Sequence, residues 1–132
     1  MKGVVVVGSN SADRKNFIKK ALLFLSELGK IESCSTIYES PDILGRGNKY
    51  LNAVVQIDFK VTEKKLHERI KNFESHCGRD HSPQGSSVVP LDIDIVIWQG
   101  VVLRPKDFNS TYFQIGYRQI FKPLSTVEIK PV

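Results

Sequence analysis

Hydrophobic and polar residues follow strand-like patterns in four segments of the chain. A valine block between glycines predicts a buried central strand over 2–7. Residues that favour strands predict a second one over 31–39. The segments 50–60 and 91–98 alternate between apolar and polar residues, which turns successive side chains to opposite faces of a sheet. The pattern therefore predicts four strands.

Two further segments carry apolar residues at intervals of three and four, the spacing of a helix with one buried face. The first predicted helix spans 13–28, with Ser11 or Asp13 as its N-cap and Gly29 as its stop signal. The second spans 63–77 and follows a threonine that is suited to capping it.

The order of these elements is β-α-β-β-α-β, which predicts an α+β, ferredoxin-like sandwich. In this fold an antiparallel sheet carries its helices on one face, and the other face is left for a functional site. No linker or repeat divides the chain, so we expect one domain over residues 1–132. The residues after Gly100 show no period, and the sequence predicts irregular structure for them.

The composition is that of an ordinary globular protein, with 41% hydrophobic and 25% charged residues in a chain of 132. No apolar stretch approaches the about 20 residues that cross a bilayer, and the valine block is too short for a signal peptide. We therefore expect a cytoplasmic protein in which Cys34 and Cys77 are reduced thiols. The formal charge of +5 favours anionic partners without choosing among nucleotides, nucleic acids and membranes.

Two aspartates, Asp92 and Asp94, are the clearest chemical signal in the sequence. Residues two apart in a strand share one face, at a spacing of roughly 7 Å. Like charges this close repel unless a cation lies between them, and Mg²⁺ binds one or two carboxylates together with water and phosphate oxygens. The alternative is the solvated polar face of an edge strand. The magnesium hypothesis fails if the carboxylates are splayed apart, or if a lysine or arginine fills the space between them.

The tripeptide Gly8-Ser9-Asn10 joins the first strand to the first helix, where backbone N–H groups are able to bind an anion. It lacks the spacing of a P-loop, so a simple tight turn is the alternative. The histidines share no metal-ligand spacing, and no Ser-His-Asp or Cys-His arrangement is indicated. His67 and His76 fall on the polar side of the second helix, where solvent exposure is the simplest interpretation.

Taken in chain order, several short strings resemble the 6-hydroxymethyl-7,8-dihydropterin pyrophosphokinase family. These strings are Gly8-Ser9-Asn10, 37–41 (IYESP), 50–55 (YLNAVV), Glu74 with Gly78-Arg79, 91–95 (LDIDI) and 123–124 (PL). The resemblance implies a ferredoxin-like α+β fold, which agrees with the element order. It also implies transfer of a pyrophosphoryl group from ATP to hydroxymethyldihydropterin in folate biosynthesis, with release of AMP and dependence on two Mg²⁺ ions.

The same resemblance implies roles for individual positions. The expected metal ligands are Asp92 and Asp94, which together with Arg79 are also the expected catalytic residues. The expected substrate-binding residues on the pterin side are Asn52, Tyr50, Pro41, Ile43 and Asn10. The expected nucleotide-binding residues are Glu74, Arg79, His81, Ile95 and Arg118.

The chain departs from the family pattern in the loop after Arg79. His81 replaces one family arginine, Gly85-Ser86 replaces an Arg-Trp pair and Val89 replaces another arginine. These losses would weaken the grip on the phosphates and bring turnover into question. One hypothesis that follows is a pterin- or nucleotide-binding module without turnover. The other is a divergent enzyme that rebuilds its positive charge from Arg79, His81, Arg104, Lys106, Arg118 or Lys122.

An RNA-binding domain is a third hypothesis, because RNA-recognition motifs share the β-α-β-β-α-β order. It is disfavoured, since the predicted strand over 50–60 lacks their stacking aromatic pattern and two aspartates on a strand face repel phosphates. We therefore expect ATP and hydroxymethyldihydropterin as partners, neither nucleic acid nor membrane, and a monomer.

Overall fold

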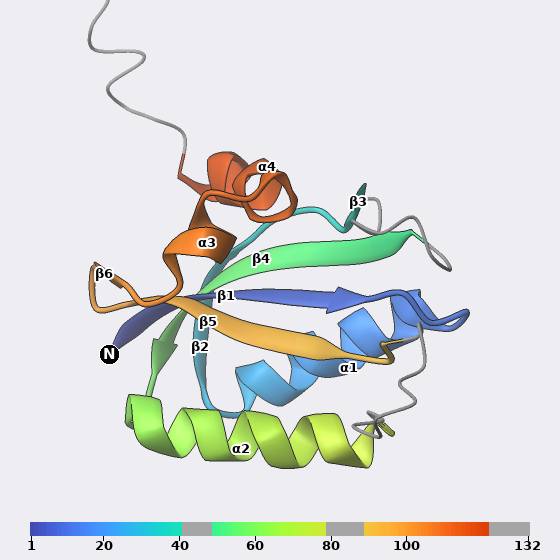
Figure 1. Cartoon of the computed structure of the whole chain (residues 1–132). Coiled ribbons are helices and arrows are strands. Elements are labelled where there is room, and N and C mark those ends of the chain that lie inside the picture. Colours follow the sequence, from blue (N-terminus) through green and yellow to red (C-terminus); the bar gives the residue numbers. More distant parts are fainter. Residues whose placement is uncertain (41–48, 79–88, 122–132) are drawn as a thin grey trace, which may run out of the picture.

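The computed structural model of the chain describes residues 1–40, 49–78 and 89–121, whose arrangement is shown in Figure 1. The elements in chain order are β1 (Lys2–Ser9), α1 (Arg14–Ser26), β2 (Gly29–Cys34), β3 (Tyr38–Ser40), β4 (Tyr50–Phe59), α2 (Glu63–His76), β5 (Asp92–Trp98), β6 (Val101–Val102), α3 (Pro105–Phe108) and α4 (Thr111–Ile120). Four predicted site residues lie outside the described residues: Pro41, Ile43, Arg79 and His81. None of the described helices is long and apolar enough to cross a membrane.

The strands pair antiparallel in one sheet, in the order β2-β4-β1-β5-β6, and β3 also pairs with β4. β1 lies between β4 and β5, so the valine block is the buried central strand that the sequence predicts. This strand order, with α1 and α2 as the two helical connections, confirms the ferredoxin-like α+β fold.

The strand predicted over 31–39 is in fact two strands. β2 pairs with residues 55–59 of β4, and β3 pairs with residues 50–52. Between them the Ser35 hydroxyl accepts a hydrogen bond from Val54 N (2.9 Å), while Ser35 N donates to Val54 O (2.8 Å). The ladder breaks here because a side chain takes the place of a backbone acceptor.

The helices α1 and α2 pack on one face of the sheet, as the sequence predicts (Figure 1). Their apolar stripes meet the inward residues of the strands in the main core. Its buried members are Val5, Val7, Ile18, Ala21, Leu25, Leu28, Ala53, Val55, Ile57, Phe59, Leu66, Ile70, Leu91, Ile93 and Ile95.

The ends of these two helices follow the prediction only in part. Thr62 caps α2 by accepting a hydrogen bond from Lys65 N (3.2 Å), as predicted. Asp13 is the N-cap residue of α1, but its side chain makes no capping hydrogen bond. Gly29 is not the stop signal of α1, which ends at Ser26. Gly29 instead begins β2, where an added Cβ atom would collide with the backbone of β4.

The described residues after Gly100, which are 101–121, are not irregular, which corrects the prediction for them; residues 122–132 lie outside the described residues. Residues 101–121 form β6, α3 and α4, and the two helices lie on the sheet face opposite α1 and α2 (Figure 1). α4 packs its aromatic residues on a second core formed by Val4, Val6, Val54, Val96 and Phe113. Gly116 brings α4 close to the sheet, since a Cβ atom there would lie 2.6 Å from Val54 Cγ2 and 2.7 Å from the Tyr38 hydroxyl. The second face of the sheet is therefore only partly open.

Candidate active site

One row of residues crosses three neighbouring strands on the sheet face that α4 partly covers. Asn52 of β4 lies opposite Gly8 of β1, and Gly8 lies opposite Asp92 of β5. Opposed residues of antiparallel strands point to the same face, as do residues two apart on one strand, so Tyr50 and Asp94 share this face. The register thus gathers the residues predicted for pterin and metal binding at one end of one face.

Gly8 keeps the centre of this row open. A Cβ atom at this position would lie 3.0 Å from Asn52 Oδ1 and 3.7 Å from Tyr50 Cδ1. A glycine within a strand commonly marks a place where a ligand or another group approaches the backbone closely. The missing side chain leaves room between the amide of Asn52 and the two aspartates.

Asp92 and Asp94, here called the acid pair, are close enough to interact. Burial raises the pKa of Asp94 to about 7, and the charge of Asp92 and a hydrogen bond with it act in the same direction. The Asp94 side chain keeps 22% of its surface exposed, so a ligand is able to reach it. The two carboxylates are therefore neighbours, which agrees with the first condition of the magnesium hypothesis, and their role as metal ligands stays a prediction.

The acid pair fits Mg²⁺. A divalent cation between the carboxylates would relieve the repulsion that helps to raise the pKa of Asp94. Over residues 1–40, 49–78 and 89–121, no group of three or more His, Cys, Asp or Glu side chains gathers as a ready metal cage. Mg²⁺ in phosphate-transferring sites uses one or two carboxylates and takes its other ligands from water and phosphate oxygens, so two aspartates are sufficient.

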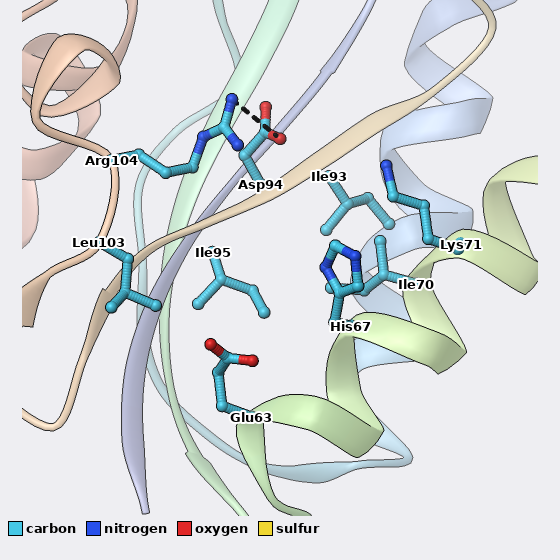
Figure 2. A pocket seen from close by; sticks show the side chains of 9 residues that line it. All are labelled: Glu63, His67, Ile70, Lys71, Ile93, Asp94, Ile95, Leu103 and Arg104. Atoms are coloured by element: carbon cyan, nitrogen blue, oxygen red, sulfur yellow. Dashed lines mark ion pairs between the residues drawn. The ribbon is translucent and has the colours of Figure 1, made fainter.

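A guanidinium borders the acid pair. Arg104 Nη2 lies 3.8 Å from Asp94 Oδ1 (Figure 2). Arg104 Nε donates a hydrogen bond to Asp107 Oδ2. This hydrogen bond is the main reason why the pKa of Arg104 is raised, and the charge of Asp94 adds to it. Because 3.8 Å is too long for a hydrogen bond, Asp107 is the firm partner and Asp94 the weaker one. The second condition of the magnesium hypothesis is therefore met only in part.

Asn52 is held rigidly on the other side of Gly8. It is only 3% exposed, and its Nδ2 donates a hydrogen bond to Ser40 Oγ (2.6 Å). Ser40 is the last residue of β3 and is itself buried. This contact fixes the orientation of an amide group that offers both a donor and an acceptor.

Glu74 is a buried glutamate of α2 that contacts β5. It is 1% exposed, and its Oε2 accepts a hydrogen bond from Ile93 N (2.8 Å), while its Oε1 lies 3.7 Å from Lys71 Nζ. Ile93 stands between the two aspartates in the sequence. Glu74 therefore ties α2 to the strand segment that carries the acid pair.

A cavity of about 240 Å³ lies between α2 and the outer edge of β5 (Figure 2). β6 pairs with β5 only at Ile97 and Trp98, so the cavity adjoins the part of β5 that β6 does not cover. Aliphatic and polar side chains share its lining, which is formed by Glu63, His67, Ile70, Lys71, Ile93, Asp94, Ile95, Leu103 and Arg104. The cavity is smaller than the about 300–1,000 Å³ of pockets that bury drug-sized ligands, so it suits one ring system beside the acid pair.

The remaining predicted residues take different positions. Asn10 is fully buried, where its Oδ1 accepts a hydrogen bond from Val89 N and its own N–H donates to Val89 O (3.1 Å). Arg118 is exposed on α4, and its Nε donates to Gln114 Oε1 (3.4 Å). Tyr50 is half-buried beside Gly8. Ile95 lines the cavity. The ligand-binding roles of these residues stay predictions.

Sequence reasoning missed part of this site. His67 is exposed, as the sequence predicts, but it also lines the cavity together with Glu63 and Lys71. The signal was present, because these three residues stand four apart along α2, beside its apolar stripe. Arg104 was expected only as one of several basic residues able to supply substitute positive charge, since its contact with Asp94 depends on how α3 packs against the sheet.

The fold and the site together define a class: a ferredoxin-like α+β protein with an acid pair, a buried amide and a cavity at the edge of the sheet. Sequence comparison then identifies the family within this class. The profile of the family described as 7,8-dihydro-6-hydroxymethylpterin-pyrophosphokinase (HPPK) matches residues 4–122, and the chain belongs to this family.

Two curated relatives agree with this result. The chain is 34% identical over 125 residues to the 2-amino-4-hydroxy-6-hydroxymethyldihydropteridine pyrophosphokinase of Aquifex aeolicus (strain VF5), a match that covers 92% of this chain and 77% of that protein. It is 28% identical over 97 residues to the folate synthesis bifunctional protein of Arabidopsis thaliana, a match that covers 72% of this chain and 20% of that protein. The resemblance suggested by the short strings is confirmed.

Proposed function

We infer that this chain is an ATP-dependent pyrophosphokinase that transfers pyrophosphate from ATP to 6-hydroxymethyl-7,8-dihydropterin in folate synthesis. Membership of the family and 34% identity to a curated pyrophosphokinase support the reaction. The single structural observation that supports it best is the row across β4, β1 and β5, which sets a buried amide opposite an acid pair. Such a row offers one place for a flat ring and another for the phosphates.

We propose that Asp92 and Asp94 hold two Mg²⁺ ions against the phosphates of ATP. When bound, the ions would neutralise charge on the phosphate oxygens and lower the pKa of the attacking hydroxyl. The contribution of the chain is to hold the carboxylates in place, and Glu74 does so through Ile93 N. Arg79 lies outside the described residues, and its expected catalytic role stays a prediction.

On the pterin side, Asn52 is proposed as the residue that recognises the edge of the ring. Its amide is fixed by Ser40, so binding the ring costs little ordering of this side chain. Tyr50 on the same face offers an aromatic surface beside it. Pro41 and Ile43 remain predicted contributors that lie outside the described residues.

On the nucleotide side, the cavity beside β5 is proposed to take the adenine ring. Ile95 and Asp94 both line it, so a base lying there would direct its phosphates toward the acid pair. Among the other predicted nucleotide contacts, Glu74 is described as a buried anchor and Arg118 as an exposed side chain of α4, whereas His81 is not described. Their roles are proposed from the resemblance.

Other properties are also proposals. We propose that residues 1–132 form one domain and that the protein is a monomer located in the cytoplasm. The pyrophosphokinase relatives give no reason to expect a nucleic-acid partner, and the acid pair would repel one.

The test is a coupled assay for AMP release from ATP with hydroxymethyldihydropterin and magnesium. Asp94→Asn is expected to reduce the rate about 100-fold or more, because it removes a charge from the electrostatic machinery of the reaction. Asp58→Asn is the matched control, since it removes the same charge from an exposed position that is paired with the N-terminus. Binding of both ligands by the unchanged protein without AMP release would favour the binding module instead.

A second arm tests the pterin side by titration with the pterin. Asn52→Ala is expected to weaken pterin binding about tenfold or more, since it leaves polar groups of a buried site unpaired, and to spare ATP. Gln56→Ala is the control, because Gln56 is an amide residue of the same strand that lies opposite Val4, four residues from Asn52 and away from Gly8. An unchanged pterin affinity in Asn52→Ala would remove this residue from the pocket.

A further inference from the structure

The guanidinium of Arg104 places a positive charge beside the acid pair. Arg104 places Nη2 3.8 Å from Asp94 Oδ1 and donates from Nε to Asp107 Oδ2. Asp107 also accepts a hydrogen bond from the hydroxyl of Tyr112 on α4. Arg104 therefore has two acidic partners, of which Asp107 is fixed by a further contact.

The backbone around Arg104 is fixed, whereas its side chain has room to move. Leu103 N donates a hydrogen bond to Val96 O of β5 (2.8 Å), and Phe108 N donates to Arg104 O (2.9 Å). The Arg104 side chain is 50% exposed. Its guanidinium is thus able to leave Asp94 by a rotation of the side chain while α3 stays in place.

We propose that Arg104 is a built-in counter-cation of the acid pair, which a divalent cation displaces from Asp94, and that Asp107 retains the displaced guanidinium. The inference rests on the proposed function, because it takes Asp92 and Asp94 as the cation ligands. A guanidinium and a divalent cation at the same carboxylate repel each other, so the two occupy Asp94 in turn. Asp107 allows Arg104 to withdraw without losing its charge-assisted hydrogen bond.

The consequence concerns the order of binding. Arg104 competes with a bare cation, so the cation binds weakly while no nucleotide is present. Phosphate oxygens would add ligands and negative charge, and the balance then moves toward the cation. Arg104 is in this sense a positioning residue: it offsets the negative charge of the acid pair until a nucleotide binds together with its metal ion.

The test measures bound Mn²⁺, used in place of Mg²⁺, by the electron paramagnetic resonance signal of the free ion. The protein carries no nucleotide in this titration. Arg104→Gln is expected to tighten Mn²⁺ binding about tenfold, which corresponds to about 1.4 kcal/mol. Lys106→Gln is the matched control, because it removes an equal charge from an exposed residue of the same short helix. A gain of the same size in both variants would reduce the effect to net charge and overturn the proposal.

Asp107→Asn provides a second, opposite prediction. Without its firm partner, Arg104 is expected to stay on the acid pair and Mn²⁺ binding is expected to weaken. In the Arg104→Gln background, Asp107→Asn is expected to have little further effect, since the guanidinium that it controls is gone. Equal effects of Asp107→Asn in both backgrounds would contradict the proposal. If Arg104→Gln does not fold by circular dichroism, Asp107→Asn in the otherwise unchanged protein decides the matter alone, and unchanged or tighter Mn²⁺ binding in it overturns the proposal.

Asp94→Asn separates this inference from the proposed function. If it abolishes Mn²⁺ binding and Arg104→Gln leaves the affinity unchanged, only the counter-cation proposal fails. If Asp94→Asn leaves Mn²⁺ binding unchanged, with and without ATP, the metal site itself fails and the present proposal fails with it.

Discussion

Glu74→Ala is expected to destabilise the protein even when no nucleotide is present. The Glu74 side chain is 1% exposed, and its Oε2 accepts a hydrogen bond from Ile93 N at 2.8 Å. Ile93 lies opposite Val7 of β1 on one edge of β5, and β6 does not reach it on the other edge. On that outer edge the Glu74 carboxylate, and no strand of the described residues, supplies the acceptor for Ile93 N. The substitution removes this acceptor and leaves a buried N–H group unsatisfied.

The size of the effect follows from these contacts. A buried hydrogen bond to a charged group contributes about 1.5–3 kcal/mol. The cavity left by the shorter side chain adds to this, so we expect Glu74→Ala to lower the free energy of unfolding by about 3 kcal/mol. At about 4 °C per kcal/mol for a domain of this size, the melting temperature should fall by about 12 °C. Glu74→Gln keeps an acceptor oxygen and should lose about half as much.

Thermal unfolding without ligands, followed by circular dichroism, measures the melting temperatures of these variants and shows whether Glu74→Ala loses more stability than Glu74→Gln. Lys71→Met should lower the free energy of unfolding by less than about 1 kcal/mol, because the Lys71 side chain is 58% exposed and its ion pair with Glu74 is long. Glu68→Ala, an exposed glutamate of the same helix, is the control. If Glu74→Ala melts like the unchanged protein and loses only ATP affinity, Glu74 is a nucleotide contact and the strand-anchor reasoning is refuted.

Two further predictions concern the acid pair and α4. The pKa of Asp94 is raised to about 7, so near neutral pH the folded state holds a proton that the unfolded state has released. The ligand-free protein should therefore become less stable as the pH rises from about 5 to about 8. Urea unfolding at these two pH values measures the change in the free energy of unfolding. Over the same rise in pH, divalent cations should bind more tightly, because a carboxylate must lose its proton to bind a metal. An equal Mn²⁺ affinity at both pH values would contradict this prediction. Gly116→Ala should destabilise by about 1–3 kcal/mol despite alanine's better helix propensity, because its Cβ would lie 2.6 Å from Val54 Cγ2. Ile115→Ala, at a partly exposed position of α4, is its control, and an unchanged urea midpoint for Gly116→Ala would show that the helix adjusts at no cost.

Three strands and the first two helices could be predicted closely because their signals are local. β1, β4 and β5 carry apolar blocks or alternation along their own length, and α2 has both its apolar stripe and its capping threonine within one segment. The fold class followed from the order of these elements. Nothing beyond neighbouring residues was needed for this part.

α4 could not be predicted because its local signals conflict. Tyr112, Phe113 and Tyr117 favour strands by propensity, and Gly116 weakens a helix by itself. In the structure these same residues are the contact surface: the aromatic rings pack on the second core, and the glycine lets α4 approach β4. Tertiary packing therefore overrides propensity, and a single sequence does not show it.

The candidate site was likewise predictable only where it lies along one strand. Asp92 and Asp94 share a face by their spacing alone, whereas their position opposite Gly8 and Asn52 depends on strand register. Arg104 and the cavity depend on how α3 and α2 pack beside β5, which no spacing reveals.

The burial of β1 on both faces explains why the chemistry gathers at one end of the sheet. Val5 and Val7 point into the main core, and Val4 and Val6 point into the second core, so no polar ligand is able to reach the strand there. At Gly8 the second face changes from apolar to polar neighbours. The boundary between the two regions is set by α4, whose distance from the sheet depends on Gly116. A helix that carries neither the acid pair nor Asn52 therefore decides how much of this face remains available to substrates.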